Sequence, residues 1–258
     1  MAPKAGFIRT LALAASVAAL AVVPAVASAG SKKDSADATR YYRVSIINLT
    51  TGQPLTPPVL ATHNGRDAVF GLDSPSRYGV QQVAENGGVP VLAAELNAGK
   101  DLGLFSDVVV APGLLVPAGL PASAVFQPSG SYIIAAKGSD NRISWVSMLI
   151  CTNDGFTGLD GLKLPKSGET VTAFANAYDT GSERNTESFA DIVGGCQGAT
   201  GVHSTTGATG TGTSDPGLFE DGIIREHAGV LGAASDGLLP SLHSWDGPVA
   251  QVTVTAIG

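Results

Sequence analysis

The segment 142–150, RISWVSMLI, places the strongest constraint on the fold, because it is apolar on both faces of an extended chain. Successive side chains of a β-strand point to opposite faces, so Trp145 and Leu149 lie opposite Val146 and Met148. A strand of this kind needs apolar cover on both sides. The segment therefore predicts a central strand in a sheet that is packed on both faces.

Four other short apolar segments also predict strands: 41–49, 131–137, 170–178 and 248–257. The last one alternates, with Val252 and Val254 on one face and Thr253 and Thr255 on the other. The intervening GSDN at 138–141 predicts a hairpin between 131–137 and 142–150.

The best helical spacing in the chain is at 76–98, where Gly87 and Gly88 divide the segment into two short helices. The Gly/Thr-rich segment 198–217 has no periodicity and predicts a mobile surface loop, with a Thr-glycosylated segment as the alternative. Many short strands with turn signals and little helix predict an all-β fold, an antiparallel β-sandwich with one or two short helices.

The first 29 residues are typical of a secretory signal peptide. Lys4 and Arg9 precede an apolar run that closes on Ala-Ser-Ala at 27–29. A retained membrane anchor is the alternative, since the run approaches spanning length. Residues 30–40 are predicted to be a flexible lead-in, and 41–258 one domain without an integral membrane segment. We expect a secreted protein, extracellular or periplasmic.

Charge and cysteine content fit that compartment. The chain of 258 residues has a net charge of −7, and loss of Lys4 and Arg9 makes it more acidic still. An acidic protein is a poor partner for nucleic acid and a better one for divalent cations. Cys151 and Cys196 are the two cysteines, and an oxidising compartment favours one disulfide between them over two free thiols.

Two acidic turns are the candidate site. Asp154 follows the segment 142–150, and Asp179 and Glu183 follow 170–178, four residues apart across a glycine. Loops at one end of a sandwich cluster, and carboxylates without thiolate or imidazole neighbours suit Ca²⁺ or Mg²⁺. The alternative is that Asp and Gly are ordinary turn residues. Asp160 and Glu187 are expected to take no part, with Asp160 facing solvent and Glu187 capping the segment 188–195.

The sequence lacks the common catalytic motifs. The chain has no G-x-S-x-G, P-loop, H-E-x-x-H or C-x-x-C. Its four histidines are scattered, so a secreted hydrolase would need a dispersed site built on His63 or His227 with nearby carboxylates. A phospholipid-binding site beside the acidic turns would rest only on Phe156 and Lys163.

From residue 41 to 257 the chain resembles the spondin N-terminal domain family, including its single-domain secreted bacterial members. The resemblance is carried by six segments, VSIINLTTGQPLTPPVLATHNGRDAVF, GVQQVAENG, ISWVSMLICTNDGFTGLDGL, YDTGSE, IIREHAGV and SWDGPVAQVTV. Tyr178 stands where the family usually has Trp, and Glu183 is one methylene longer than the Asp of its animal members.

The resemblance implies a β-sandwich related to calcium-dependent phospholipid-binding modules, with one bound Ca²⁺. It assigns the calcium carboxylates to Asp154, Asp179 and Glu183. It also implies a non-enzymatic role in cell adhesion at a cell surface or in extracellular matrix, through an extracellular protein or glycan ligand.

Overall fold

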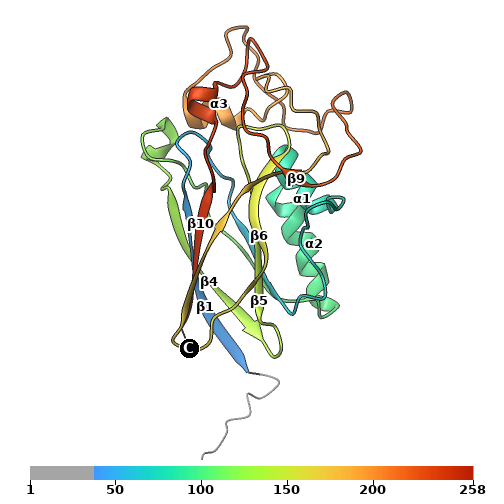
Figure 1. The fold of residues 1–258 in the computed structure, drawn as a ribbon, viewed down its shortest axis with the longest axis vertical. Coiled ribbons are helices and arrows are strands. Elements are labelled where there is room, and N and C mark those ends of the chain that lie inside the picture. The colour runs from blue at the N-terminus through green and yellow to red at the C-terminus, as the bar shows by residue number, and fades with distance from the viewer. Residues whose placement is uncertain (1–37, 258) are drawn as a thin grey trace, which may run out of the picture. The chain divides into compact units, whose positions relative to one another are not determined.

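In the computed structural model, residues 38–257 are described, and they form a sandwich of two antiparallel sheets (Figure 1). The predicted signal peptide, 1–29, and most of the lead-in, 30–40, lie outside the described residues. The first strand begins at Thr39, two residues before the predicted start of the domain.

The first sheet has four strands. Their order across the sheet is β4 (Ser129–Lys137), β1 (Thr39–Asn48), β10 (Ala250–Ala256) and β7 (Thr170–Ala175). The second sheet has six strands, in the order β3 (Phe105–Val110), β2 (Val59–His63), β5 (Arg142–Met148), β6 (Gly155–Lys163), β8 (Ala177–Asp179) and β9 (Arg225–Glu226). All neighbouring strands pair antiparallel, which confirms the predicted sandwich.

The main core lies between the two sheets. Val252 and Val254 of β10 are buried and pack into the same cluster as Trp145 of β5, whereas Thr253 and Thr255 point outward and bond hydroxyls of β7. The alternation predicted for 248–257 is confirmed. A sheet with one buried and one hydrated face is the ordinary result of such alternation.

Two helices cover the outer face of the second sheet, α1 (Tyr78–Asn86) and α2 (Val89–Asp101). Val146 and Met148 of β5 pack in the cluster that the helices complete, so the prediction of a strand covered on both faces is confirmed. The predicted break at Gly87 is also confirmed, because Gly87 ends α1 with φ 64° and its N–H bonds to Val83 O. The remaining helical turns, η1 (Pro121–Ala124), α3 (Gly195–Thr200) and α4 (Pro240–His243), lie in loops.

Two local predictions are wrong, for one physical reason. β4 and β5 do not form a hairpin, because β4 pairs with β1 in the first sheet and β5 pairs with β2 and β6 in the second. Segment 170–178 is not one strand, because Ala175 pairs with β10 whereas Ala177 pairs with β6. In both places the chain crosses from one sheet to the other, which local turn and strand propensities do not specify.

The loop 198–217 is irregular beyond α3, as predicted, but it is packed against its neighbours. Thr211 bridges to Val193, and the Asp236 carboxylate accepts hydrogen bonds from Thr205 N and Ser204 Oγ. This loop and α3 lie at the same end of the sandwich as the connection from β5 to β6 (Figure 1). No helix among residues 38–257 is long and apolar enough to cross a bilayer.

Candidate cation site

A disulfide joins Cys151 to Cys196, with an S–S distance of 2.08 Å, and so confirms the predicted pairing. Both residues are fully buried, and they pack with Ile150, Phe189 and Ile192 under the loops at this end of the sandwich. The bond ties the loop after β5 to α3. Asp154 therefore lies three residues from a covalent anchor.

A tight turn places Asp154 between β5 and β6. Thr152 Oγ1 donates to Leu149 O at 2.6 Å and accepts from Gly155 N at 3.0 Å, which closes the turn. The Asp154 carbonyl accepts from Thr180 N, so the turn also pairs with the segment after β8. The result is a carboxylate on a rigid backbone with no exposed surface.

The two oxygens of the Asp154 carboxylate have different surroundings. Oδ2 accepts hydrogen bonds from Thr180 Oγ1 at 2.8 Å, Ser182 N at 2.8 Å and Glu183 N at 3.1 Å. Oδ1 is buried and has no hydrogen-bond partner. A buried carboxylate oxygen without a partner is energetically costly. It is the feature of this site that requires an explanation.

Electrostatics at Asp154 add to that cost. Burial and, second to it, the negative charge of Asp179 raise the pKa of Asp154 to about 7, against hydrogen bonds from Glu183, Thr180 and Ser182 that lower it. The carboxyl is therefore only partly ionised at neutral pH. A bound cation would supply the missing partner and reverse the shift.

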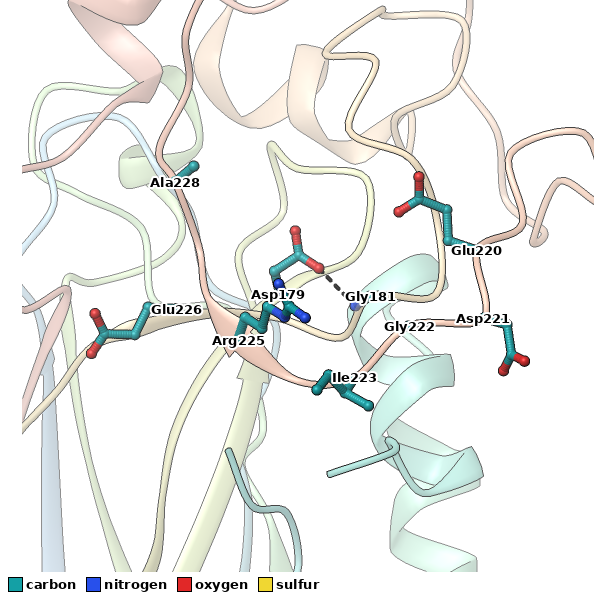
Figure 2. A pocket seen from close by; sticks show the side chains of 9 residues that line it. All are labelled: Asp179, Gly181, Glu220, Asp221, Gly222, Ile223, Arg225, Glu226 and Ala228. Carbon is teal, nitrogen blue, oxygen red and sulfur yellow. Dashed lines mark hydrogen bonds between the residues drawn. The ribbon is translucent and has the colours of Figure 1, made fainter. Parts of the chain in front are cut away.

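Asp179 lies at the end of β8, beside Asp154. Its Oδ1 accepts from Gly181 N at 2.6 Å, and its Oδ2 accepts from Asn185 Nδ2. Gly181 has φ 67°, and a Cβ there would lie 2.8 Å from Ile223 N, so this turn requires glycine. Figure 2 shows the Asp179 carboxylate bonded to Gly181 at the wall of a pocket of about 470 Å³.

That pocket is acidic. Glu220, Asp221 and Glu226 line it together with Asp179, and Arg225 is the one basic residue among its lining residues (Figure 2). In Figure 2 the Asp221 and Glu226 carboxylates point away from that of Asp179, in opposite directions. The acidic face adds a negative potential around Asp179, which favours a cation over an anion.

Glu183 is brought to the site by its backbone rather than by its carboxylate. Its N–H bonds Asp154, whereas its Oε1 accepts from Asp215 N at 2.9 Å. Burial raises the pKa of Glu183 to about 7, with smaller contributions from the charges of Glu85 and Asp154. The three predicted ligands thus come from neighbouring turns, but the Glu183 carboxylate is committed to Asp215.

Among the described residues, one set of three His, Cys, Asp or Glu donor atoms lies within 4.8 Å of one another. It consists of Cys151, Cys196 and His243, and its two sulfurs are already joined as a disulfide, so it is no metal centre. Asp154, Asp179 and Glu183 do not form such a set. Direct ligation of one ion by all three carboxylates stays a prediction.

The histidines of the hydrolase alternative are placed as follows. His63 Nε2 lies 2.8 Å from Ser144 Oγ, but both residues are buried. Gly65 N donates to His63 Nδ1, so the ring proton is on Nε2 and is donated to Ser144, whose hydroxyl in turn donates to Asp160. This is the reverse of the proton direction that a serine nucleophile needs.

His227 packs edge-on against Trp245, with ring centroids 5.2 Å apart, and its Nδ1 accepts from Gly229 N. Its Nε2 is buried without a hydrogen-bond partner. Burial lowers the pKa of His227, against the raising effect of the Asp179 and Glu187 charges. The ring is therefore held neutral close to the acidic turns.

Two residues expected to be passive have structural partners. The Asp160 carboxylate, on exposed Asp160, accepts from Val69 N at 2.7 Å and so holds the 67–70 segment against β6. Glu187 does not cap 188–195; it is buried and accepts from Leu231 N at 2.6 Å and Ala233 N at 2.7 Å. The expectation was wrong because these partners are 44 and 46 residues away in sequence.

Sequence reasoning missed the hydroxyl groups that hold Asp154. Thr180 and Ser182 donate to its Oδ2, and both are buried. The available signal was the Thr-Gly-Ser spacing directly after Asp179, since two hydroxyls separated by glycine suit a carboxylate cradle.

Comparisons with protein-family models and with curated sequences identify no relative of this chain. The likeness to spondin N-terminal domains rests on the residues quoted above.

Proposed function

We propose that this chain is a secreted, calcium-binding β-sandwich of the spondin N-terminal type, and that it acts by binding an extracellular protein or glycan in cell adhesion. The observation that carries the calcium proposal is the buried, unpartnered Oδ1 of Asp154. The adhesion role rests on the family resemblance. The Cys151–Cys196 disulfide is in keeping with an oxidising compartment.

The residues present fit Ca²⁺ better than a transition metal. The partners at the two turns are carboxylate, hydroxyl and backbone oxygens, which suit a hard cation. Asp154 Oδ1 and the Asp179 carboxylate would hold the ion. Glu183 is the predicted third ligand, and to reach the ion its carboxylate would have to leave Asp215 N.

In this proposal the ion is structural. It would neutralise Asp154 and Asp179 and so hold the loop after β5 against the segment 180–183, next to the disulfide. Loops fixed in this way form a preorganised surface at one end of the sandwich, which lowers the entropic cost of binding a partner. The chain's own residues provide the surface, and the ion provides its rigidity.

Thermal unfolding tests the calcium proposal. Binding to the folded state alone at 100 times Kd adds about 2.7 kcal/mol of stability, which raises the Tm of a domain of this size by roughly 5–10 °C. We expect that rise on adding excess Ca²⁺ to chelated protein, and we expect Asp154→Asn to abolish it. Asp160→Asn, on the adjoining strand, is the matched control and should keep the rise. Identical melting curves with calcium and with chelator would refute the proposal.

Binding and turnover assays test the functional class. We expect calcium-dependent retention on a matrix-protein or glycan array, and no hydrolysis of ester, phosphate, glycoside or peptide substrates above blank. Calcium-dependent hydrolysis that disappears in Asp154→Asn would instead favour the hydrolase alternative.

A further inference from the structure

A second pocket, of about 310 Å³, lies between α1 and the loop 213–219. It is separate from the acidic pocket around Asp179, with which it shares no lining residue. The residues that line it are Gln81, Glu85, Ser182, Glu183, Ser214, Asp215, Pro216 and Phe219. Three chain segments far apart in sequence therefore build one concave surface.

Two of these residues are buried carboxylates, with Glu85 3% and Glu183 4% exposed. Both oxygens of Glu85 are satisfied by uncharged donors, Gln81 Nε2 at 2.6 Å and Ser214 Oγ. Glu183 Oε1 accepts from Asp215 N, but no described residue donates a hydrogen bond to its Oε2. The floor of the pocket thus contains one carboxylate oxygen that is open to a donor.

The negative charge of the pocket has no cationic partner within it. No lining residue is basic, and the ion pairs of the described residues are both made by Arg77, with Asp67 and Glu95. The charge of Glu85 acts on Glu183, and two nearby buried carboxylates without a cation repel. A positively charged ligand would relieve that repulsion.

One part of the pocket wall is apolar. Pro216 and Phe219 line it, and the Phe219 side chain is 65% exposed. An exposed aromatic ring beside carboxylates can hold an alkyl chain against its face and attract a cation electrostatically. The pocket therefore combines an apolar entrance with an anionic floor.

We propose that this pocket binds a primary ammonium group at the end of an alkyl chain, as presented by a lysine side chain of a partner protein. The ammonium would donate to Glu183 Oε2, and the alkyl stem would lie along Pro216 and Phe219. A single open oxygen suits a compact ammonium better than the planar fork of arginine, which prefers two parallel acceptors. A divalent metal would find fewer oxygens and an apolar wall instead of water.

Titration by NMR with Nα-acetyl-lysine N-methylamide tests the proposal, with its Nε-acetylated analogue as the uncharged control. We expect the lysine probe to shift resonances of α1 and 213–219, and the analogue to bind at least about tenfold more weakly. Glu183→Gln should weaken the probe at least about tenfold, and Phe219→Ala about threefold, the loss typical of an exposed cation–π contact. Glu220→Gln, which alters an exposed neighbouring acid outside the pocket, should leave binding unchanged.

Each titration is done in chelator and in excess Ca²⁺, with melting curves to confirm that the variants fold. Binding of the lysine probe in both conditions supports a lysine pocket independent of the Asp154 site. The proposal is overturned if the two probes bind equally, if neither binds, or if Glu183→Gln binds the lysine probe with full affinity. Displacement of the lysine probe by calcium also overturns it and assigns the Glu183 carboxylate to the ion.

Discussion

Asp154→Asn should change the pH dependence of stability in the absence of calcium. The pKa of Asp154 is raised from 3.8 to about 7 in the folded protein, chiefly by burial. A group whose pKa rises on folding stabilises the fold when it is protonated, and that contribution is lost as the pH rises through the folded pKa. Chelated wild type should therefore lose stability between mildly acidic and mildly alkaline pH.

The magnitude follows from the pKa shift. A shift of this size corresponds to a total of roughly 4 kcal/mol, of which more than half accrues between about pH 5 and about pH 8. The asparagine variant cannot ionise, yet its amide oxygen can still accept the hydrogen bonds that Thr180, Ser182 and Glu183 donate. Glu183 titrates in both proteins, and its titration differs between them only by the small contribution that the Asp154 charge makes to its pKa.

Urea unfolding followed by tryptophan fluorescence measures the difference, in chelator at the two pH values. We expect the variant to be more stable than wild type at the higher pH, and the gap to narrow at the lower pH. The addition of calcium at the higher pH should restore wild type and leave the variant unchanged. A wild-type free energy of unfolding that changes no more with pH than that of the variant would refute the reasoning.

Two further predictions concern the disulfide and the strand packing that support the site. The double substitution Cys151→Ala and Cys196→Ala removes the disulfide and opens a loop of 45 residues, which should lower the free energy of unfolding by roughly 4 kcal/mol. Intact-mass analysis of the native wild-type protein should find no alkylatable thiol. Gly158→Ala would place a Cβ 2.1 Å from Trp145 O and so force β6 away from β5. We expect this variant to lower the free energy of chemical unfolding by more than roughly 2 kcal/mol. The control Gly212→Ala has no atom within 4 Å of the new Cβ and should change that free energy little. Equal stability of the two glycine variants would show that the close contact between β5 and β6 is wrong.

The sandwich itself could be predicted because its strands carry their burial in their own sequence. The segment 142–150 is apolar on both faces, and β5 has the sheet core on one face and the helices on the other. Gly87 ends α1 because a glycine accepts the left-handed backbone there. These features depend on residues within one turn or strand of each other.

The crossings between the sheets could not be predicted in the same way. The turn at 138–141 has hairpin composition, but pairing is decided by β1 and β2, which lie about a hundred residues earlier. Asn176 is exposed between buried Ala175 and Ala177, and nothing local shows that these two alanines belong to different sheets. Long-range pairing is the missing information in both places.

The candidate site could also be predicted only in part. The sequence places Asp154 and Asp179 in turns after the predicted strands 142–150 and 170–178, and the structure brings them into electrostatic contact through the pairing of β6 with β8. The side chain of Glu183 could not be placed, because its partner Asp215 lies 32 residues downstream in an irregular loop. Spacing predicts which turns meet, but it does not predict which way a flexible glutamate side chain points.

Isothermal titration of chelated protein with Ca²⁺ tests the central claim most directly, because it counts ions as well as detecting them. Binding of one ion per chain in wild type and Asp160→Asn, and none in Asp154→Asn, is the predicted result. Absence of binding heat in wild type, or unchanged stoichiometry and affinity in Asp154→Asn, would contradict the assignment of the buried Asp154 oxygen to a calcium ion.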